Sequence, residues 1–292
     1  MKKILFSIFL VLITASGLYA DQVRSIVTEV EGLACMGRDK SMSETETMAM
    51  QEAKRKAAEY AATYIKSETD MKDFILEKDL VAAYTRAMIK ILQEIDKTWY
   101  KDPASGQCYR IKIKAEVVPD EGSMKKIANK DLSDNPSAPL TVKVYTDKST
   151  YRAGEKIKIF LKGNRPFFAN IIYKNADGQL LQLLPNPYRQ QNYFQGGAVF
   201  EIPSGDDKYD LEVTEPFGTE TVTVYASSSQ IGDLDLKAQG AVYEVKTKPR
   251  DISVGTRGVK FSVKDTQIKE SGSAPRPAAQ FIESSVTINT SR

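Results

Sequence analysis

The second half of the chain is dominated by short runs in which apolar and polar residues alternate. Clear examples are Leu140–Thr146, Lys156–Leu161 and Glu220–Ala226. Alternation with a period of two gives a β-strand one apolar face, and that face must be covered by another layer. Asp177-Gly178 is typical of a tight hairpin between two such runs. This spacing predicts an all-β, sandwich-like domain over residues 140–292, and a barrel is the alternative. Further strands are expected at 168–173, 180–184, 198–202, 208–214 and 241–246.

Residues 21–119 show a different pattern, in which strands flank helices. The β-rich run from Val23 to Leu33 predicts an opening strand. Ser43, with Glu46 three residues later, resembles a capping box, and the helix that follows extends to about Ile65. Its apolar positions recur at helical spacing and predict one face packed closely on a sheet; they are Met50, Ala53, Ala57, Ala61 and Tyr64.

The rest of this N-terminal region mixes the two periodicities. Residues 78–96 are consistent with a helix that turns into a strand, and the spacing does not place the change. Tyr109–Val117 alternates cleanly as a half-buried strand. We therefore expect an α+β domain of strand, helices and strands over residues 21–119. The polar residues that follow, 120–139, have the composition of a linker.

The first twenty residues have the layout of a secretory signal peptide. Lys2 and Lys3 precede an apolar run, Ile4–Ile13, and small residues lead to Ala20. The run is about half as long as a bilayer-spanning helix needs, so we expect cleavage and no remaining anchor; an uncleaved anchor is the alternative. The sequence thus predicts a periplasmic, or otherwise exported, protein of the cell envelope.

Cys35 and Cys108 are the only cysteines in the sequence. In an exported protein an even pair usually forms a disulfide, and two buried thiols are the alternative. If the opening strand and the Tyr109 strand run antiparallel, the two cysteines meet at one end of the pair. We expect the bond to be structural, because no Cys-x-x-Cys spacing is present.

Charge and histidine content exclude several classes of function. Without Lys2 and Lys3, 39 basic residues remain of the 41, against 38 acidic ones, so the exported chain is nearly neutral. Such a balance argues against a nucleic-acid partner. The sequence has no histidine, which removes the usual general base and the commonest metal ligand. We therefore predict no catalytic residues, no metal and no cofactor; a carboxylate-dependent hydrolase and a Ser-Lys hydrolase are the enzymatic alternatives.

Two resemblances follow from ordered motifs. Glu31-Gly32-Leu33-Ala34, the alanine-spaced helix and the Tyr109-x-Ile-x-Ile strand resemble a small α/β envelope domain. That domain occurs in the N-terminal part of the flagellar T-ring assembly protein and in related outer-membrane lipoproteins. The β-rich half resembles the bacterial domain of unknown function 4384, which implies an exported or membrane-attached all-β module without an established activity. The motifs that carry this second resemblance are Tyr151-x-x-Gly154-Glu155, Asp177-Gly178, Leu184-Pro185-Asn186-Pro187-Tyr188, Ile202-Pro203 and Pro216-x-Gly218-x-Glu220.

The segment after residue 184 is the candidate recognition site. Pro185 and Pro187 cannot donate to a strand ladder, and Asn186 can hold the turn between them. One interpretation is a rigid exit from a strand. The other is a recognition loop, because tyrosine, arginine and amide side chains suit contact surfaces; its candidate residues are Asn186, Tyr188, Arg189, Gln191 and Tyr193.

Two alternating runs, 258–264 and 281–290, end the chain. On one face of the second run Ile282, Val286 and Ile288 line up with Ser284 between them. We expect these strands to complete the β domain, and donation of a strand to a partner is the alternative. Overall the sequence predicts a non-catalytic envelope interaction or assembly protein that binds envelope proteins. A glycan- or peptidoglycan-binding module and a regulatory partner of a separate envelope enzyme are the alternatives.

Overall fold

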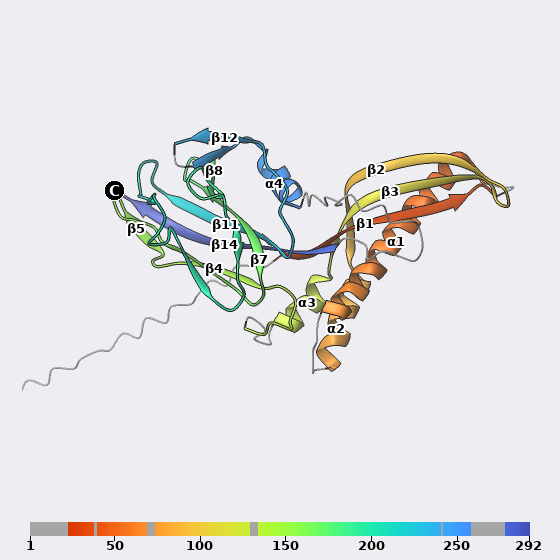
Figure 1. Cartoon of the computed structure of the whole chain (residues 1–292), viewed down its shortest axis with the longest axis horizontal. Helices are drawn as coiled ribbons and strands as arrows, with labels where there is room; N and C mark the ends of the chain where they lie inside the picture. Colours follow the sequence, from red (N-terminus) through yellow and green to blue (C-terminus); the bar gives the residue numbers. More distant parts are fainter. Residues whose placement is uncertain (1–22, 38–39, 69–73, 129–133, 241, 258–277) are drawn as a thin grey trace, which may run out of the picture.

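The computed structural model describes residues 23–37, 40–68, 74–128, 134–240, 242–257 and 278–292. Figure 1 shows an α/β part at one end of an elongated molecule and a β-rich part at the other. An 11-stranded sheet runs through both parts. Its strands lie in the order β12 (Leu236–Gln239), β13 (Val242–Val245), β8 (Leu180–Leu184), β7 (Phe167–Lys174), β11 (Thr219–Ser227), β14 (Ala278–Ser291), β1 (Val23–Cys35), β3 (Gly106–Val118) and β2 (Met88–Asp102). Two short strands, β5 (Thr150–Arg152) and β9 (Tyr193–Phe194), pair beside this path. The predicted fold class, an α+β domain followed by an all-β, sandwich-like domain, is confirmed, and most of the strand pairs are antiparallel. The predicted signal peptide lies outside the described residues.

The α/β part is a three-stranded section of this sheet with helices on one face. Its strands are antiparallel, and β3 lies between β1 and β2. Helix α1 lies along the sheet (Figure 1), and the mixed segment resolves into a helix ending at Thr85 and a strand starting at Met88. The elements are β1 Val23–Cys35, α1 Met42–Glu68, α2 Phe74–Thr85, β2 Met88–Asp102, β3 Gly106–Val118 and α3 Glu121–Ala128.

Helix α1 begins two residues earlier than a cap at Ser43 predicts, and it has a different cap. The Ser41 backbone N–H donates to Glu44 Oε2 over 2.7 Å, and the Glu44 N–H donates to Ser41 Oγ over 3.2 Å. This reciprocal pair is the capping box, so the prediction of Ser43 and Glu46 was wrong by two residues. Glu46 instead accepts a hydrogen bond from Trp99 Nε1 on β2, at 3.1 Å.

Alanines let α1 approach the sheet closely. Its buried face carries Ala49, Ala53, Ala57, Ala61 and Ile65, whereas the predicted Met50 and Tyr64 lie at its margin. On the facing strand, a Cβ added to Gly32 would lie 1.9 Å from the Ala49 carbonyl oxygen. Helix and strand backbones are therefore in contact at Gly32, where no larger residue fits.

The predicted linker is partly helical. Residues 121–128 form α3, whose first turn is capped by Asp120: the Ser123 N–H donates to its Oδ1 over 2.9 Å. Ile127 is buried in the same core as α1. The polar composition concealed this helix, because a short helix needs few apolar residues to dock.

The β-rich part is a sandwich. A three-stranded sheet, β10-β6-β4, covers one face of the long sheet, and the core between them includes Phe167, Ile171, Phe194 and Val224. The elements are β4 Val142–Thr146, β5 Thr150–Arg152, β6 Ile159–Gly163, β7 Phe167–Lys174, β8 Leu180–Leu184, β9 Tyr193–Phe194, β10 Val199–Ile202, β11 Thr219–Ser227, β12 Leu236–Gln239, β13 Val242–Val245, α4 Pro249–Thr256 and β14 Ala278–Ser291.

Strand β14 joins the two parts. Its first residues pair with β1, with Ala278 opposite Thr28, and its later residues pair with β11, with Val286 opposite Val222. Ile282 and Ile288 belong to the sandwich core, and Val286 packs against it, as the alternation predicted. Within the described structure β14 pairs with its own chain. The other predicted strand, 258–264, lies outside the described residues.

Candidate functional site

The loop between β8 and β9 is organised around Asn186. This side chain is fully buried, and its Nδ2 donates to the Leu183 carbonyl oxygen over 2.7 Å. Its Oδ1 accepts from the backbone N–H groups of Tyr188, at 2.9 Å, and Arg189, at 2.8 Å. The backbones of Asn186 and Arg189 also exchange hydrogen bonds. Asn186 therefore sets the shape of the loop and does not face a ligand.

The Arg189 side chain also makes its contacts within the fold. Its Nη1 lies 2.9 Å from Asp207 Oδ2, and its guanidinium lies 5.8 Å from the centre of the Phe194 ring. Asp207 accepts a second hydrogen bond, of 2.7 Å, from the Ser204 N–H. The charge of Arg189 is thus neutralised within the fold, which leaves little of it for a partner.

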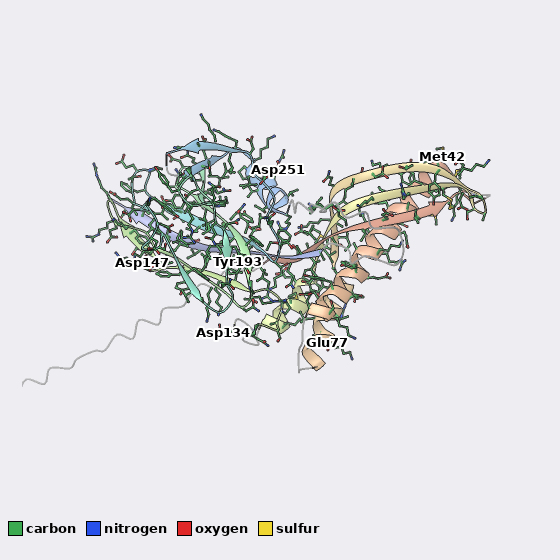
Figure 2. The ribbon with its side chains drawn as sticks, viewed as in Figure 1. Met42, Glu77, Asp134, Asp147, Tyr193 and Asp251 are labelled. Atoms are coloured by element: carbon green, nitrogen blue, oxygen red, sulfur yellow. A yellow bond between two sulfur atoms is a disulfide. The ribbon has the colours of Figure 1, made fainter. Side chains whose placement is uncertain are left out.

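The exposed members of the loop are aromatic and amide side chains. Tyr188 is 60% exposed and Tyr193 is 38% exposed, and Gln191 also faces solvent. The Tyr188 ring stacks on that of Tyr209 at 6.5 Å, and Tyr193 packs on Phe168 at 5.1 Å. Tyr193 lies within the β-rich part, far from the start of α1 at Met42 (Figure 2). Of the five candidate residues, Asn186 and Arg189 therefore support the loop from within the fold. Tyr188, Gln191 and Tyr193 remain exposed.

Tyr209 and Asp207 are supports that sequence reasoning missed. They come from the segment after β10, where the predicted strand at 208–214 was wrong. The segment forms only an isolated bridge, between Glu212 and Lys156, and no local pattern ties it to the loop. Burial, followed by the nearby Asp207 charge, raises the pKa of Tyr209 above its usual value. Tyr209 therefore stays neutral and acts as a packing surface under Tyr188.

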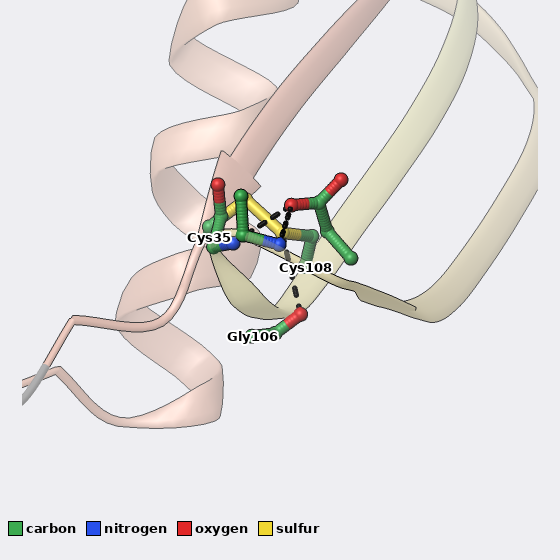
Figure 3. Close-up of a disulfide and its surroundings, with 6 residues drawn as sticks. Cys35, Gly106 and Cys108 are labelled. Carbon is green, nitrogen blue, oxygen red and sulfur yellow. Dashed lines mark hydrogen bonds between the residues drawn. A yellow bond between two sulfur atoms is a disulfide. The ribbon is translucent and has the colours of Figure 1, made fainter.

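The disulfide between Cys35 and Cys108 is present, as predicted (Figure 3). The two residues are directly opposite in the β1–β3 register, and their Cα atoms are 3.9 Å apart. The bond closes the outer end of the α/β sheet. It is distant in the fold from the loop at residues 186–193 and acts as a structural link.

Residues 150–230 match the family model described as Domain of unknown function (DUF4384). This match confirms the resemblance of the β-rich half, and the DUF4384 region includes the whole loop and its supports. No curated protein and no solved structure matches the chain. The resemblance of the N-terminal domain to the T-ring assembly protein stays a prediction.

A cluster of charges with a buried ion pair at its centre lies between the DUF4384 region and the α/β part. The Arg257 guanidinium forms a close ion pair with Glu116 of β3 and lies 3.9 Å from Glu283 of β14. Lys90 approaches Glu116 from β2 at 3.9 Å. Burial raises the pKa of Glu283, and Arg257 opposes that rise. Arg257 thus connects Glu116 of the α/β part with Glu283 of β14, and the cluster contributes to the packing of the two parts.

A cavity of about 290 Å³ lies at the same junction on the opposite face of the sheet. Tyr64, Gln280 and Ser228 line it, and Arg165 bonds Glu68 across it at 3.0 Å. Its charges are thus paired with one another. In the described part of the chain, no group of three or more acidic or cysteine side chains is arranged to hold a metal. No described helix is long and apolar enough to cross a membrane.

Proposed function

We propose that the protein is an exported, non-catalytic interaction or assembly protein of the cell envelope. One observation carries the proposal: the Tyr188 backbone N–H donates to the buried Asn186 Oδ1 over 2.9 Å, while Tyr188 as a whole is 60% exposed. The side chain of Asn186 is hydrogen-bonded to Leu183, and that of Arg189 is paired with Asp207, both within the fold. A contact residue held by such supports loses little conformational entropy on binding.

A protein partner fits the residues that remain exposed. Tyr188 and Tyr193 offer large rings with one polar atom each, and Gln191 offers an amide. Side chains of this kind are enriched where two proteins meet. The near-neutral composition of the exported chain favours such contacts over binding to a polyanion.

Cross-linking in cells tests the proposal. A photo-reactive residue replaces Tyr188, and the matched control replaces Val199, which is 51% exposed on β10. We expect one dominant protein adduct from position 188 in the envelope fraction and none from position 199. Equal adducts at the two positions, or none at 188, would contradict an interaction through the loop.

A second candidate is a module that binds cell-wall glycan. The stacked rings of Tyr188 and Tyr209 favour it, because an exposed ring on a rigid support also suits the apolar face of a sugar. Sedimentation with purified cell-wall sacculi separates the two candidates. Co-sedimentation that is lost in Tyr188→Ala would favour the glycan, and a protein adduct without co-sedimentation would favour the protein partner.

A further inference from the structure

Strand β2 is a free edge of the long sheet. It pairs with β3 on one side, and no described residue pairs with its other side. Its length is 15 residues, so a long row of backbone N–H and C=O groups is open to another strand. Such edges accept extended segments of other chains by strand addition.

Natural edges are usually protected, and the protection of β2 is uneven. The pairing with β3 shifts register between Ile91 and Gln93 and again between Glu94 and Asp96. These irregularities interrupt a template for strand addition. Before them, residues 88–91 keep a regular register. In that stretch Met88 is 62% exposed and Ile91 is 36% exposed. Three of its four residues are apolar, and the fourth, Lys90, lies 3.9 Å from Glu116 of its own chain.

A groove adjoins this section on the side of the helices. We call it the edge groove; it has a volume of about 520 Å³ and is lined by Lys54, Arg55, Ala58, Ala62, Thr85 and Ile89, among others. The floor is apolar because α1 presents alanines there. Side chains alternate across a strand, so every second side chain of a segment added to β2 would enter this groove.

The charges at the groove indicate what the segment carries. Arg55 is already bonded to Glu52, at 2.8 Å, and to Glu59. Lys54 lines the same groove and has no acidic partner among the described residues. A carboxylate on the incoming segment would complement Lys54, whereas a basic segment would be repelled.

We propose that residues 88–91 of β2 and the edge groove bind an extended segment of a partner protein, which carries an apolar side chain for the groove and a carboxylate for Lys54. The segment adds a strand to the sheet, and its apolar side chain packs over Ala58. This surface belongs to the α/β part, so the proposal does not depend on the loop at Tyr188.

Selection of peptides on the purified full-length exported chain tests this proposal. The probe is a phage-displayed library of random peptides, selected on the wild type and counter-selected on Ala58→Trp, which fills the groove. Gln51→Trp adds the same ring at an exposed position of α1 outside the groove and is the matched control. We expect enriched peptides with an apolar and an acidic residue, which bind the wild type and Gln51→Trp equally.

Binding of the synthetic peptides then decides the outcome. We expect about a tenfold or greater loss of affinity in Ala58→Trp and in Lys54→Glu, and recovery on Lys54→Glu when the peptide's acidic residue becomes lysine. Hydrogen exchange of the amides at residues 88–91 should slow in the complex. Peptides that bind Ala58→Trp and Gln51→Trp alike, an absence of enriched peptides, or unchanged exchange at these amides would overturn the proposal. Lys54→Glu changes only a surface charge, so it tests the site even where Ala58→Trp fails to fold.

Discussion

The contact between Gly32 and helix α1 makes a quantitative prediction about stability. In Gly32→Ala the new Cβ would lie 1.9 Å from the Ala49 carbonyl oxygen and 2.7 Å from the Ala53 backbone nitrogen. Both atoms belong to the helix backbone, so no side-chain rotation relieves the overlap. Ordinary van der Waals contact begins at about 3.4 Å, so α1 has to move away from the sheet by roughly 1.5 Å.

That movement affects the whole alanine face of α1. Ala49, Ala53, Ala57 and Ala61 are fully buried, and alanines are too short to follow the sheet when the helix backs away. Overpacking of a core typically costs about 1–3 kcal/mol and occasionally more. We expect about 3 kcal/mol here, because the clash involves backbone and opens a gap along several turns.

Urea unfolding with tryptophan fluorescence measures the effect. Trp99 is the only tryptophan in the sequence, and its Nε1 donates to Glu46 of α1 over 3.1 Å, so it reports on this packing. With a slope of about 2 kcal/mol per molar urea, a loss of 3 kcal/mol lowers the midpoint by roughly 1.5 M. Gly37→Ala is the control, because nothing lies within 4 Å of its added Cβ. Equal midpoints for the two variants would refute the close approach of helix and strand.

Three further predictions concern buried charges, the disulfide and alkaline pH. Glu116→Ala should lower the free energy of unfolding by about 3–5 kcal/mol, because the Arg257 cation stays buried without its main partner. Adding Arg257→Met to this variant should restore part of the loss. Equal unfolding midpoints for the single and the double variant would contradict this prediction. Cys108→Ser removes a cross-link between residues with a sequence separation of 73. It should lower the free energy of unfolding by about 4 kcal/mol relative to the wild type, with both proteins unfolded in the absence of reductant. Burial, and then the hydrogen bond to Asp147, raises the pKa of Tyr151 to about 12. The contribution of the neutral Tyr151 hydroxyl to the free energy of unfolding is therefore complete below about pH 10, and it is lost as pH rises through 12. The stability difference between wild type and Tyr151→Phe should therefore shrink over that interval, and a constant difference would refute the assignment.

Much of the secondary structure was predictable because it depends on local spacing. The alternating run at 281–290 placed Ile282 and Ile288 on one face before any partner strand was known. The two cysteines were matched by the same logic, since antiparallel strands bring the end of one beside the start of the other. The helix cap was misplaced because Ser41–Glu44 and Ser43–Glu46 have the same spacing, and only backbone geometry distinguishes them.

The loop at residues 186–193 shows where local reasoning stops. Its composition left two interpretations open, a rigid exit from a strand and a recognition loop with five candidate contact residues. The fold assigns Asn186 and Arg189 to internal hydrogen bonds and leaves Tyr188, Gln191 and Tyr193 exposed. The difference depends on Asp207 and Tyr209, which are brought under the loop by tertiary packing. Sequence spacing contains no information about such a contact.

The two cysteines of the sequence predicted a bond between Cys35 and Cys108, with two buried thiols as the alternative. By itself the sequence determined the order of the two parts and the strand-rich character of the second. These features follow from hydrophobic periodicity and turn chemistry, which act over a few residues. Only the tertiary structure decided that β14 lies between β1 and β11, so that one sheet passes through both parts. It also left β2, among the described residues, as an edge of the sheet beside a groove. Which strands become neighbours depends on burying faces that are far apart in the chain, and a local pattern records that a face is apolar but not what covers it.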